Sequence, residues 1–400
     1  MDDALAIAII VAAAVGSQIV ARALRIPAIV PLLAAGMLLG PYVVDAFDPD
    51  ALFGDLVDPI VELAVGVILF EGSLLLRREE LHGSVGPVVG RLVTFGFAIT
   101  WALSAAAAVV LFDMDARMAI LLGAVLSLSG PTVILPLLEH VRPRQRVGAV
   151  LKWEGILIDP IGAIFAVLAF NAISTGGSEF QPGPFLATVG VGAGVGIAAA
   201  LPAIVALRDA RVTSSLESSV LLALVLVAVA GASEIREDAG LVAAIAMGVT
   251  LAHRREDIER EAHEFVTTLT SLLIGILFVI LSARVDPERI ADLGWEGAAF
   301  VAFLILAVRP LSALVGTIRT GLVWEERGLI AWMMPRGIVA AATVSAFELS
   351  LAEQNVADHE LLVPVTFLVV VATVVVYGLT ARPVARTLGV TEDSSEGASP

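Results

Sequence analysis

The chain has 400 residues, of which 58% are hydrophobic and only 16% are charged, and its mean hydropathy is +0.93. Soluble globular proteins carry about a quarter charged residues, so this composition excludes an ordinary soluble enzyme or binding domain and indicates a polytopic membrane protein. The formal net charge of −16 comes mostly from loops, which is typical of solvated loop surfaces. The absence of cysteine from the sequence excludes disulfides and thiolate metal sites.

Apolar runs of about 20 residues, the length that spans the hydrocarbon core of a bilayer, recur along the whole chain. They predict thirteen transmembrane helices. The first run follows the acidic start MDDALAIAII, which lacks the basic residues of a cleavable signal, so we expect it to be a permanent span. The predicted spans are residues 3–22, 27–44, 58–76, 86–112, 116–138, 147–170, 185–207, 215–233, 238–253, 264–283, 296–318, 328–348 and 361–381.

Basic residues are distributed unevenly between the two sides of these spans. With thirteen spans and an external N-terminus, seventeen basic residues fall in or beside the inner loops, against four in the outer loops: Arg117, Arg236, Arg284 and Arg289. Cytoplasmic loops of membrane proteins carry an excess of Lys and Arg. The asymmetry therefore supports the count of thirteen and predicts an external N-terminus and a cytoplasmic C-terminus.

Two predicted spans are interrupted near their middle by proline and glycine. The fifth contains LSLSGPTVILP, with Gly130 and Pro131, and the twelfth contains WMMPRGIVAAA, with Pro335 and Gly337. Irregular backbone at membrane depth is tolerated only beside protein or a water-filled cavity, so interruptions at matching positions indicate a transporter's binding site. Two kinked packing helices are the alternative explanation.

The matched interruptions also predict an internal duplication. Residues 1–170 and 215–381 would form two six-helix halves joined by helix 185–207, and this single connecting helix inverts the second half in the membrane. The predicted fold is an all-α polytopic membrane protein with thirteen transmembrane helices, two inverted six-helix repeats, and interrupted, crossing helices 5 and 12. It occupies residues 1–387, and we expect the acidic segment 388–400 to be a disordered tail.

Charged residues lie well within several predicted spans, where a charge at the bilayer centre costs about 2.5 kcal/mol or more. Each of them therefore needs a partner or a hydrated cavity. They are Glu71, Arg91, Glu154, Asp159, Arg309 and Arg336.

The sixth span, LKWEGILIDPIGAIFAVLAF, carries the features of an ion site around Asp159. Gly155 lies four residues earlier on the same helix face, and its missing side chain is expected to leave room for an ion. Pro160 lacks a backbone donor, which frees the carbonyl of Ile156 as an oxygen ligand. Because burial favours the protonated form of a carboxylate, we predict that a monovalent metal cation, Na+ or K+, competes with a proton for Asp159. A purely structural hydrogen-bonding role is the alternative.

Glu154 lies five positions before this aspartate, a helical rotation of roughly 140°, and so faces a different neighbour. We predict a structural ion pair between Glu154 and Arg336, at the break in the twelfth span. Two alternatives stay open for Glu71: it completes the cation site through water, or it pairs with Arg91 or Arg309.

These segments resemble the NhaP-type branch of the monovalent cation/proton antiporters, within the sodium/proton exchanger family. That branch carries Thr-Asp-Pro in the fifth span, Glu-Ser-x-x-Asn-Asp in the sixth and Pro-Arg-Gly in the twelfth, where this chain has SGP (129–131), EGILID (154–159) and PRG (335–337). The resemblance covers essentially the whole chain. It implies that Asp159 binds the ion and the proton, that Glu154 and Arg336 form a structural pair, and that Ser129 and Glu71 contribute to the cation site.

The resemblance also implies a function and an assembly. It indicates a homodimer in the plasma membrane that exchanges Na+ for H+ by an elevator-like movement of a six-helix core, with no enzymatic activity, cofactor or nucleic-acid partner. A single titrating aspartate predicts electroneutral exchange. Gly130, Gly155 and Ile158 depart from the pattern by lacking an acid, a hydroxyl and an amide, which leaves the choice between Na+ and K+ open.

The main alternative is a K+/H+ efflux system that is normally regulated by a cytoplasmic domain. A cation channel would need a ring of identical filter elements, and an intramembrane aspartyl protease would need two facing aspartates; the sequence offers neither. The five histidines fall in or near loops without metal-ligand spacing, which argues against a metalloenzyme.

Overall fold

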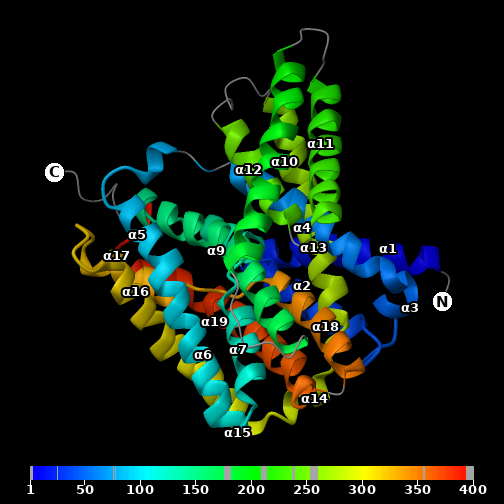
Figure 1. Ribbon diagram of the computed structural model, residues 1–400, viewed down its shortest axis with the longest axis vertical. Coiled ribbons are helices and arrows are strands. Elements are labelled where there is room, and N and C mark those ends of the chain that lie inside the picture. The colour runs from blue at the N-terminus through cyan, green and yellow to red at the C-terminus, as the bar shows by residue number, and fades with distance from the viewer. Residues whose placement is uncertain are drawn as a thin grey trace. The chain divides into compact units, whose positions relative to one another are not determined.

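The structure is a computed structural model that describes residues 3–24, 26–74, 76, 78–174, 182–208, 214–236, 239–252, 260–354 and 356–392. Within these ranges the chain is helical, apart from one isolated β-bridge between Pro143 and Thr391 (Figure 1). The helices are α1 (Asp3–Leu24), α2 (Ile29–Leu39), α3 (Pro49–Phe53), η1 (Gly54–Leu56), α4 (Val57–Leu74), η2 (Arg78–Leu81), α5 (Val85–Arg91), η3 (Leu92–Gly96), α6 (Phe97–Phe112), α7 (Ala116–Ser127), α8 (Pro131–Val141), α9 (Gln145–Ser174), α10 (Pro182–Arg208), α11 (Ser214–Ile235), α12 (Ala239–Ala252), α13 (Arg260–Ala283), α14 (Pro287–Ala291), α15 (Gly294–Phe303), η5 (Leu304–Val308), α16 (Arg309–Thr317), α17 (Trp324–Trp332), α18 (Ile338–Glu353), η6 (His359–Leu361) and α19 (Leu362–Thr387).

Each predicted span coincides with a helix or with a run of consecutive helices. Eight segments within the described ranges are long and apolar enough to cross a membrane, and they fall on predicted spans 1, 4, 6, 7, 8, 10, 11 and 13. Spans 2, 5, 9 and 12 coincide with shorter apolar helices, and span 3 coincides with α4. The chain is therefore a multi-pass, all-helical membrane protein, and the total of thirteen crossings stays a prediction.

The chain divides into two compact units. Unit 1 comprises Met1–Leu52, Glu79–Glu179 and Phe278–Pro400, and unit 2 comprises Phe53–Arg78 and Phe180–Leu277. Each unit takes segments from both predicted halves of the sequence, so the spatial division differs from the division into repeats.

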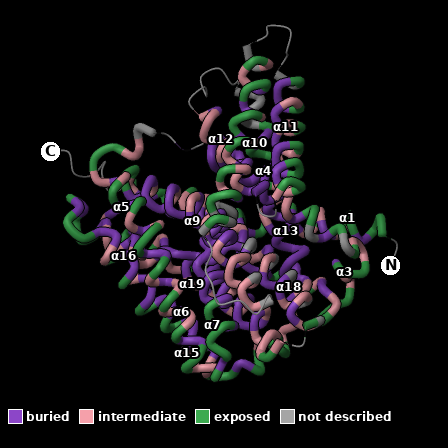
Figure 2. The backbone as a smooth tube through the Cα atoms, in the orientation of Figure 1, coloured by how far each residue is buried: buried purple, intermediate pink, exposed green. Residues whose placement is uncertain are grey.

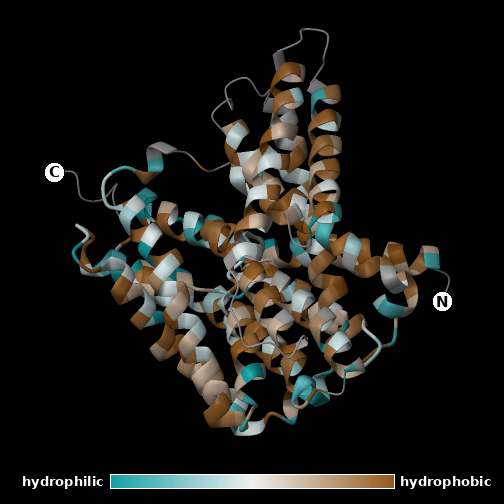
Figure 3. Ribbon diagram, in the orientation of Figure 1, coloured by the Kyte–Doolittle hydropathy of each residue, from teal (hydrophilic) through white to brown (hydrophobic). Residues whose placement is uncertain are grey.

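Unit 2 is held together by small residues that let helix backbones meet. Helices α10, α11 and α12 pack on one another, and Figure 1 shows α10 and α11 side by side. A Cβ added to Gly192 would lie 2.6 Å from the Ala239 carbonyl oxygen, and α10 repeats this approach one turn later, where Gly196 meets Ala243. Such close contact between glycine and alanine is how membrane helices gain packing energy without a hydrophobic effect. The outer surfaces of α10 and α11 are apolar (Figure 3).

The helices of unit 1 differ in how deeply they are buried. Helices α9 and α19 carry long stretches of buried residues, whereas α6 and α15 are more exposed (Figure 2). Helix α9 contacts α7, α8, α17 and α18, and α19 contacts α7, α8, α17 and α18 as well. The helix that carries Asp159 is therefore enclosed by both predicted interrupted spans.

Both predicted interruptions are present. Helix α7 ends at Ser127 and α8 begins at Pro131, while α17 ends at Trp332 and α18 begins at Ile338. Gly130 and Gly337 each precede the second helix with extended backbone. Helix α7 contacts α18, and the crossing predicted for these spans stays a prediction.

A second matched irregularity was not foreseen. The predicted fourth and eleventh spans, which hold the same position in the two halves, each contain one π-helical turn, at η3 (Leu92–Gly96) and η5 (Leu304–Val308). Single π turns within α-helices occur frequently at functional sites. Arg91 directly precedes η3 and Arg309 directly follows η5, so each turn adjoins a membrane arginine.

Candidate functional site

The two interrupted helices meet through a serine. Ser129, in the break between α7 and α8, is 3% exposed and donates a hydrogen bond from its Oγ to the carbonyl oxygen of Pro335, at 3.2 Å. Pro335 lies in the break between α17 and α18. This contact joins two segments whose backbone lacks regular helical hydrogen bonds, and it brings together residues 206 positions apart.

Asp159 lies in α9 and is fully buried. Neither of its carboxylate oxygens has a hydrogen-bond partner within the part of the chain that the structure describes. A buried carboxylate without partners is costly, because it has lost its water without gaining protein contacts. Such a group is suited to bind a proton or a cation.

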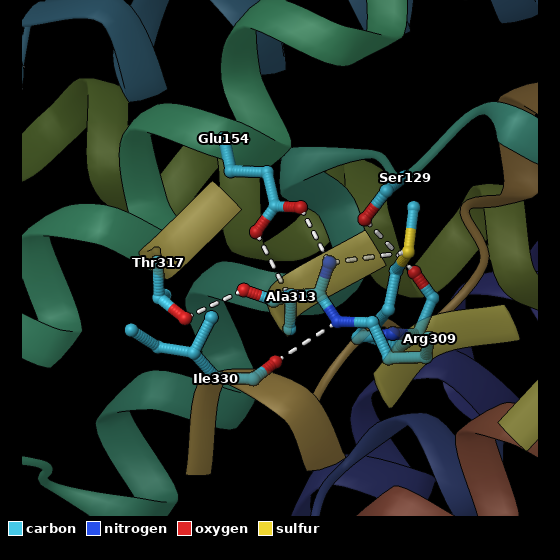
Figure 4. A network of polar contacts seen from close by, with 8 residues as sticks. Ser129, Glu154, Arg309, Ala313, Thr317 and Ile330 are labelled. Atoms are coloured by element: carbon cyan, nitrogen blue, oxygen red, sulfur yellow. Dashed lines mark hydrogen bonds and ion pairs between the residues drawn. The ribbon is translucent and has the colours of Figure 1, made fainter. Parts of the chain in front are cut away.

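Glu154, five residues before Asp159 on the same helix, is also buried, and it pairs with Arg309 (Figure 4). The Oε1 atom of Glu154 lies 2.5 Å from Nη1 of Arg309, and Oε2 lies 2.9 Å from Nη2. The same guanidinium donates to the Ile330 carbonyl at 2.9 Å and contacts the Met334 sulfur at 3.4 Å. Arg309 is 1% exposed and Glu154 is 3% exposed, so the two side chains form a buried bidentate ion pair.

The predicted pairing of Glu154 with Arg336 is therefore corrected. A bidentate pair needs the planar guanidinium to face the carboxylate, and Arg309, at the first turn of α16, meets that requirement. Arg336 is 2% exposed, its backbone N–H donates to Thr373 Oγ1 at 3.2 Å, and its Nη1 has no hydrogen-bond partner among the described residues. The arginine at the break is thus a buried cation available to offset the partial charges of the broken helix ends.

Two departures from the family pattern are filled by apolar packing. The expectation that Gly155 leaves room for an ion is wrong, because a Cβ added there would lie 2.7 Å from Cγ2 of Ile134 and 3.4 Å from the Ser129 carbonyl. Ile158 is fully buried and clusters with Phe97 and Met334. Neither position therefore offers a side-chain oxygen to a cation, and the space at the Cβ position of Gly155 is occupied by Ile134.

Glu71 lies in α4, in the part of the chain that forms unit 2, and it is 5% exposed. It accepts a hydrogen bond from Thr267 Oγ1 at 3.1 Å, within the same unit. Of its two predicted arginine partners, Arg309 uses its guanidinium for Glu154, and Arg91 donates to the Ile318 carbonyl. The role of Glu71 in the cation site stays a prediction.

The comparison with known families decides the kind of protein. Residues 7–387 match the family described as sodium/hydrogen exchanger, transmembrane. The chain belongs to this family. It resembles the NhaP-type exchangers in particular: the K(+)/H(+) antiporter NhaP2 of Shewanella sp. (strain ANA-3) is 24% identical over 331 residues, which are 80% of this chain and 56% of that protein.

Two further exchangers extend the comparison. The K(+)/H(+) antiporter NhaP of Alkalimonas amylolytica is 24% identical over 386 residues, or 95% of this chain and 64% of that protein. This exchanger chain therefore spans 56% and 64% of the lengths of the two relatives. The structure of the sodium proton antiporter MjNhaP1 from Methanocaldococcus jannaschii has a TM-score of 0.81, covers 97% of this chain and 99% of that chain, and is 21% identical, which shows a shared fold.

Three contacts of this candidate site were not predicted from the sequence. Arg309 was recognised as a buried charge but not as the partner of Glu154, although it is the only arginine within the eleventh predicted span. Thr373 on α19 is an ordinary apolar-helix threonine in the sequence, and only the fold shows that it accepts the Arg336 N–H. Ile134 carries no sequence signal at all for its contact with Gly155.

Proposed function

We propose that this protein is a secondary active antiporter that exchanges a monovalent cation for H+ across the plasma membrane. The observation that carries the proposal is Asp159, a fully buried carboxylate on a helix that contacts both interrupted helices, whose two oxygens have no hydrogen-bond partner among the described residues. Family membership supports a transporter with these substrates. The exchange needs no enzymatic step and no resident cofactor.

The mechanism follows from the two acids of α9. Glu154 is neutralised by Arg309 and is not free to exchange its partner, whereas Asp159 must take either a proton or a cation to be neutral. Because a bare charge is costly at membrane depth, reorientation is favoured only when Asp159 is occupied. One charge in each direction then makes the exchange electroneutral, and alternating access proceeds by an elevator-like movement of a core carried by the interrupted helices.

Na+ is the proposed cation, and K+ is the second candidate. The filled positions at Gly155 and Ile158 leave Asp159 and backbone carbonyls, including that of Ile156, as oxygen ligands. Oxygen ligands suit both ions, so the geometry does not separate them. The Shewanella and Alkalimonas relatives, which are K(+)/H(+) antiporters, favour K+, and MjNhaP1, a sodium proton antiporter, favours Na+. A homodimer with an external N-terminus and a cytoplasmic C-terminus completes the proposal.

The test is proton flux in proteoliposomes, driven in turn by Na+, K+ and Li+ gradients. Asp159→Asn keeps the size of the side chain but removes its charge and its proton exchange, and we expect it to abolish cation-driven flux. The matched control is Asp50→Asn, an exposed acid paired with Arg284, which we expect to exchange at the parent's rate.

Two results would contradict the proposal. Cation-driven proton flux that persists in Asp159→Asn would show that another group carries the proton. Flux in the parent that depends on a clamped membrane voltage would refute electroneutral exchange and would point to a second titrating acid, for which Glu71 is the candidate.

A further inference from the structure

Residues 388–392, which directly follow α19, are docked rather than free. Helix α19 ends in a Schellman motif: Gly389 has φ of +65°, its N–H bonds to the Arg386 carbonyl at 3.0 Å, and the Val390 N–H bonds to the Ala385 carbonyl at 3.0 Å. Val390 and Ala385, the two residues joined by the second of these hydrogen bonds, are both fully buried. The prediction of a disordered tail is therefore wrong for residues 388–392, and residues 393–400 lie outside the described part of the chain.

This segment, Leu388–Glu392, forms a short antiparallel pairing with the connection between α8 and α9. The Arg144 N–H donates to the Val390 carbonyl at 2.7 Å, and the Glu392 N–H donates to the Arg142 carbonyl at 3.1 Å. Pro143 and Thr391 face each other in the bridge, and Thr391 is only 4% exposed. We call Leu388–Glu392 the strap.

The strap also reaches the second interrupted helix. A Cβ added to Gly328 of α17 would lie 3.2 Å from a methyl group of Leu388. Nearby, Arg146 in the first turn of α9 lies 3.7 Å from Glu326 of α17. The end of α8, the start of α9, the end of α19 and part of α17 thus lie around the strap.

The strap contacts the connection between two helices of the candidate ion site, so its position can affect that site. Only residues 142–144 separate α8 from α9, so a displacement of the connection moves both helices. Helix α8 begins directly after the break that holds Ser129, and α9 carries Asp159. A long, flexible loop would absorb such a displacement, whereas a three-residue connection transmits it.

We propose that the strap is a coupling device: when docked, it holds the α8–α9 connection and α17 in the arrangement that transports, and its release slows exchange. The inference rests on the proposed function, because its main readout is cation/proton exchange. Docking itself can be measured independently of transport.

The first experiment compares two truncations of the full chain in proteoliposomes. Truncation after Glu392 keeps the strap and is the control, and truncation after Leu388 removes the backbone groups that pair with the connection. We expect the shorter chain to exchange on the order of tenfold more slowly at equal amounts of folded protein, because it loses two backbone hydrogen bonds and a buried valine. Equal exchange rates for the two truncations would overturn the proposal.

The second experiment uses the absence of cysteine from the chain. The hydrogen bonds flank Pro143 and Thr391, which makes them a non-hydrogen-bonded antiparallel pair with Cα atoms about 4.5 Å apart, within disulfide range. We expect the double variant Pro143→Cys/Thr391→Cys to form a disulfide under mild oxidation and to retain exchange. Adding Val390→Asp should slow exchange in the reduced protein, and oxidation should restore it, which separates release of the strap from misfolding.

The outcomes are distinct. Failure of the disulfide to form would show that the strap is not docked, and loss of exchange on oxidation of the double variant would show that the strap must detach during transport; either result overturns the proposal. If the parent exchanges no cation, the proposed function fails, and the yield of the disulfide alone then decides whether the strap is docked.

Discussion

Replacing Arg309 by methionine removes the charge that neutralises Glu154 while keeping an unbranched side chain in the same space. Arg309 donates two hydrogen bonds to Glu154 and one to the Ile330 carbonyl, and both charged groups are at least 97% buried. A hydrogen bond to a charged group contributes about 1.5–3 kcal/mol. Removing one member of a buried pair costs about 3–5 kcal/mol, because the other charge stays buried without compensation. We therefore expect Arg309→Met to lower the free energy of unfolding by about 3–5 kcal/mol.

A double-mutant cycle assigns that free energy to the pair. Glu154→Gln, Arg309→Met and the double variant are unfolded by denaturant in detergent, with the fluorescence of the five tryptophans as the readout. The coupling free energy between Glu154 and Arg309 should be about 3 kcal/mol, at the top of the range for residues in direct contact. The matched control is the cycle with Arg336→Met, for which we expect a coupling below about 1 kcal/mol, because Arg336 makes no described hydrogen bond to Glu154.

A stronger coupling of Glu154 to Arg336 than to Arg309 would contradict the pairing seen in the structure. The expected cost of an unpaired Glu154 is refuted if Arg309→Met is as stable as the parent, since that would mean that the unpaired glutamate has been neutralised at no cost.

Three further predictions concern the packing around α9 and the end of α8. Gly155→Ser should destabilise the protein by about 1–3 kcal/mol through overlap with Ile134, and should cost less when Ile134→Ala is present, as measured by denaturant unfolding. Ile158→Asn should lower the free energy of unfolding by about 1–3 kcal/mol in the same assay, because it buries an amide in an apolar cluster. His140, at the end of α8, has its pKa lowered from 6.5 by burial and then by the charges of two nearby arginines. Because the folded protein binds this proton less tightly than the unfolded chain does, stability should fall as the pH drops below about 6.5, and less so in His140→Gln, as measured by melting temperature.

Each of these predictions has a clear contrary outcome. A cost for Gly155→Ser that is unchanged by Ile134→Ala would mean that the two side chains do not compete for space. Full stability of Ile158→Asn would indicate a polar partner at that position. A pH dependence of the melting temperature that is identical in His140→Gln and the parent would place the acid sensitivity elsewhere.

The sequence was sufficient to predict the helices and the breaks, because both depend on local features. Apolar runs of bilayer length favour helices, and proline with glycine interrupts a helix, so the helices and the interruptions at Gly130 and Gly337 were predictable. The burial of Asp159 followed in the same way from its position in an apolar run. That its oxygens have no hydrogen-bond partner among the described residues was not predictable, since it depends on every neighbouring helix.

The pairing and the packing required the three-dimensional structure. Glu154 had three candidate arginines in the sequence, and which of them faces it depends on the rotation of α16, which directly follows a π turn. The space beside Gly155 is filled by Ile134, which is 21 residues away in the chain. The docked strap was missed because an acidic, small-residue composition predicts disorder, whereas two buried residues and two backbone hydrogen bonds fix residues 388–392.

In the proposed mechanism, one proton and one cation compete for Asp159. Titration calorimetry of Na+ and K+ binding in two buffers of different ionisation enthalpy measures how many protons the protein releases for each cation that it binds. The account predicts about one proton per cation for the parent at a pH where Asp159 is protonated, and no cation binding by Asp159→Asn. Cation binding without proton release in the parent, or binding of equal strength in Asp159→Asn, would contradict the account.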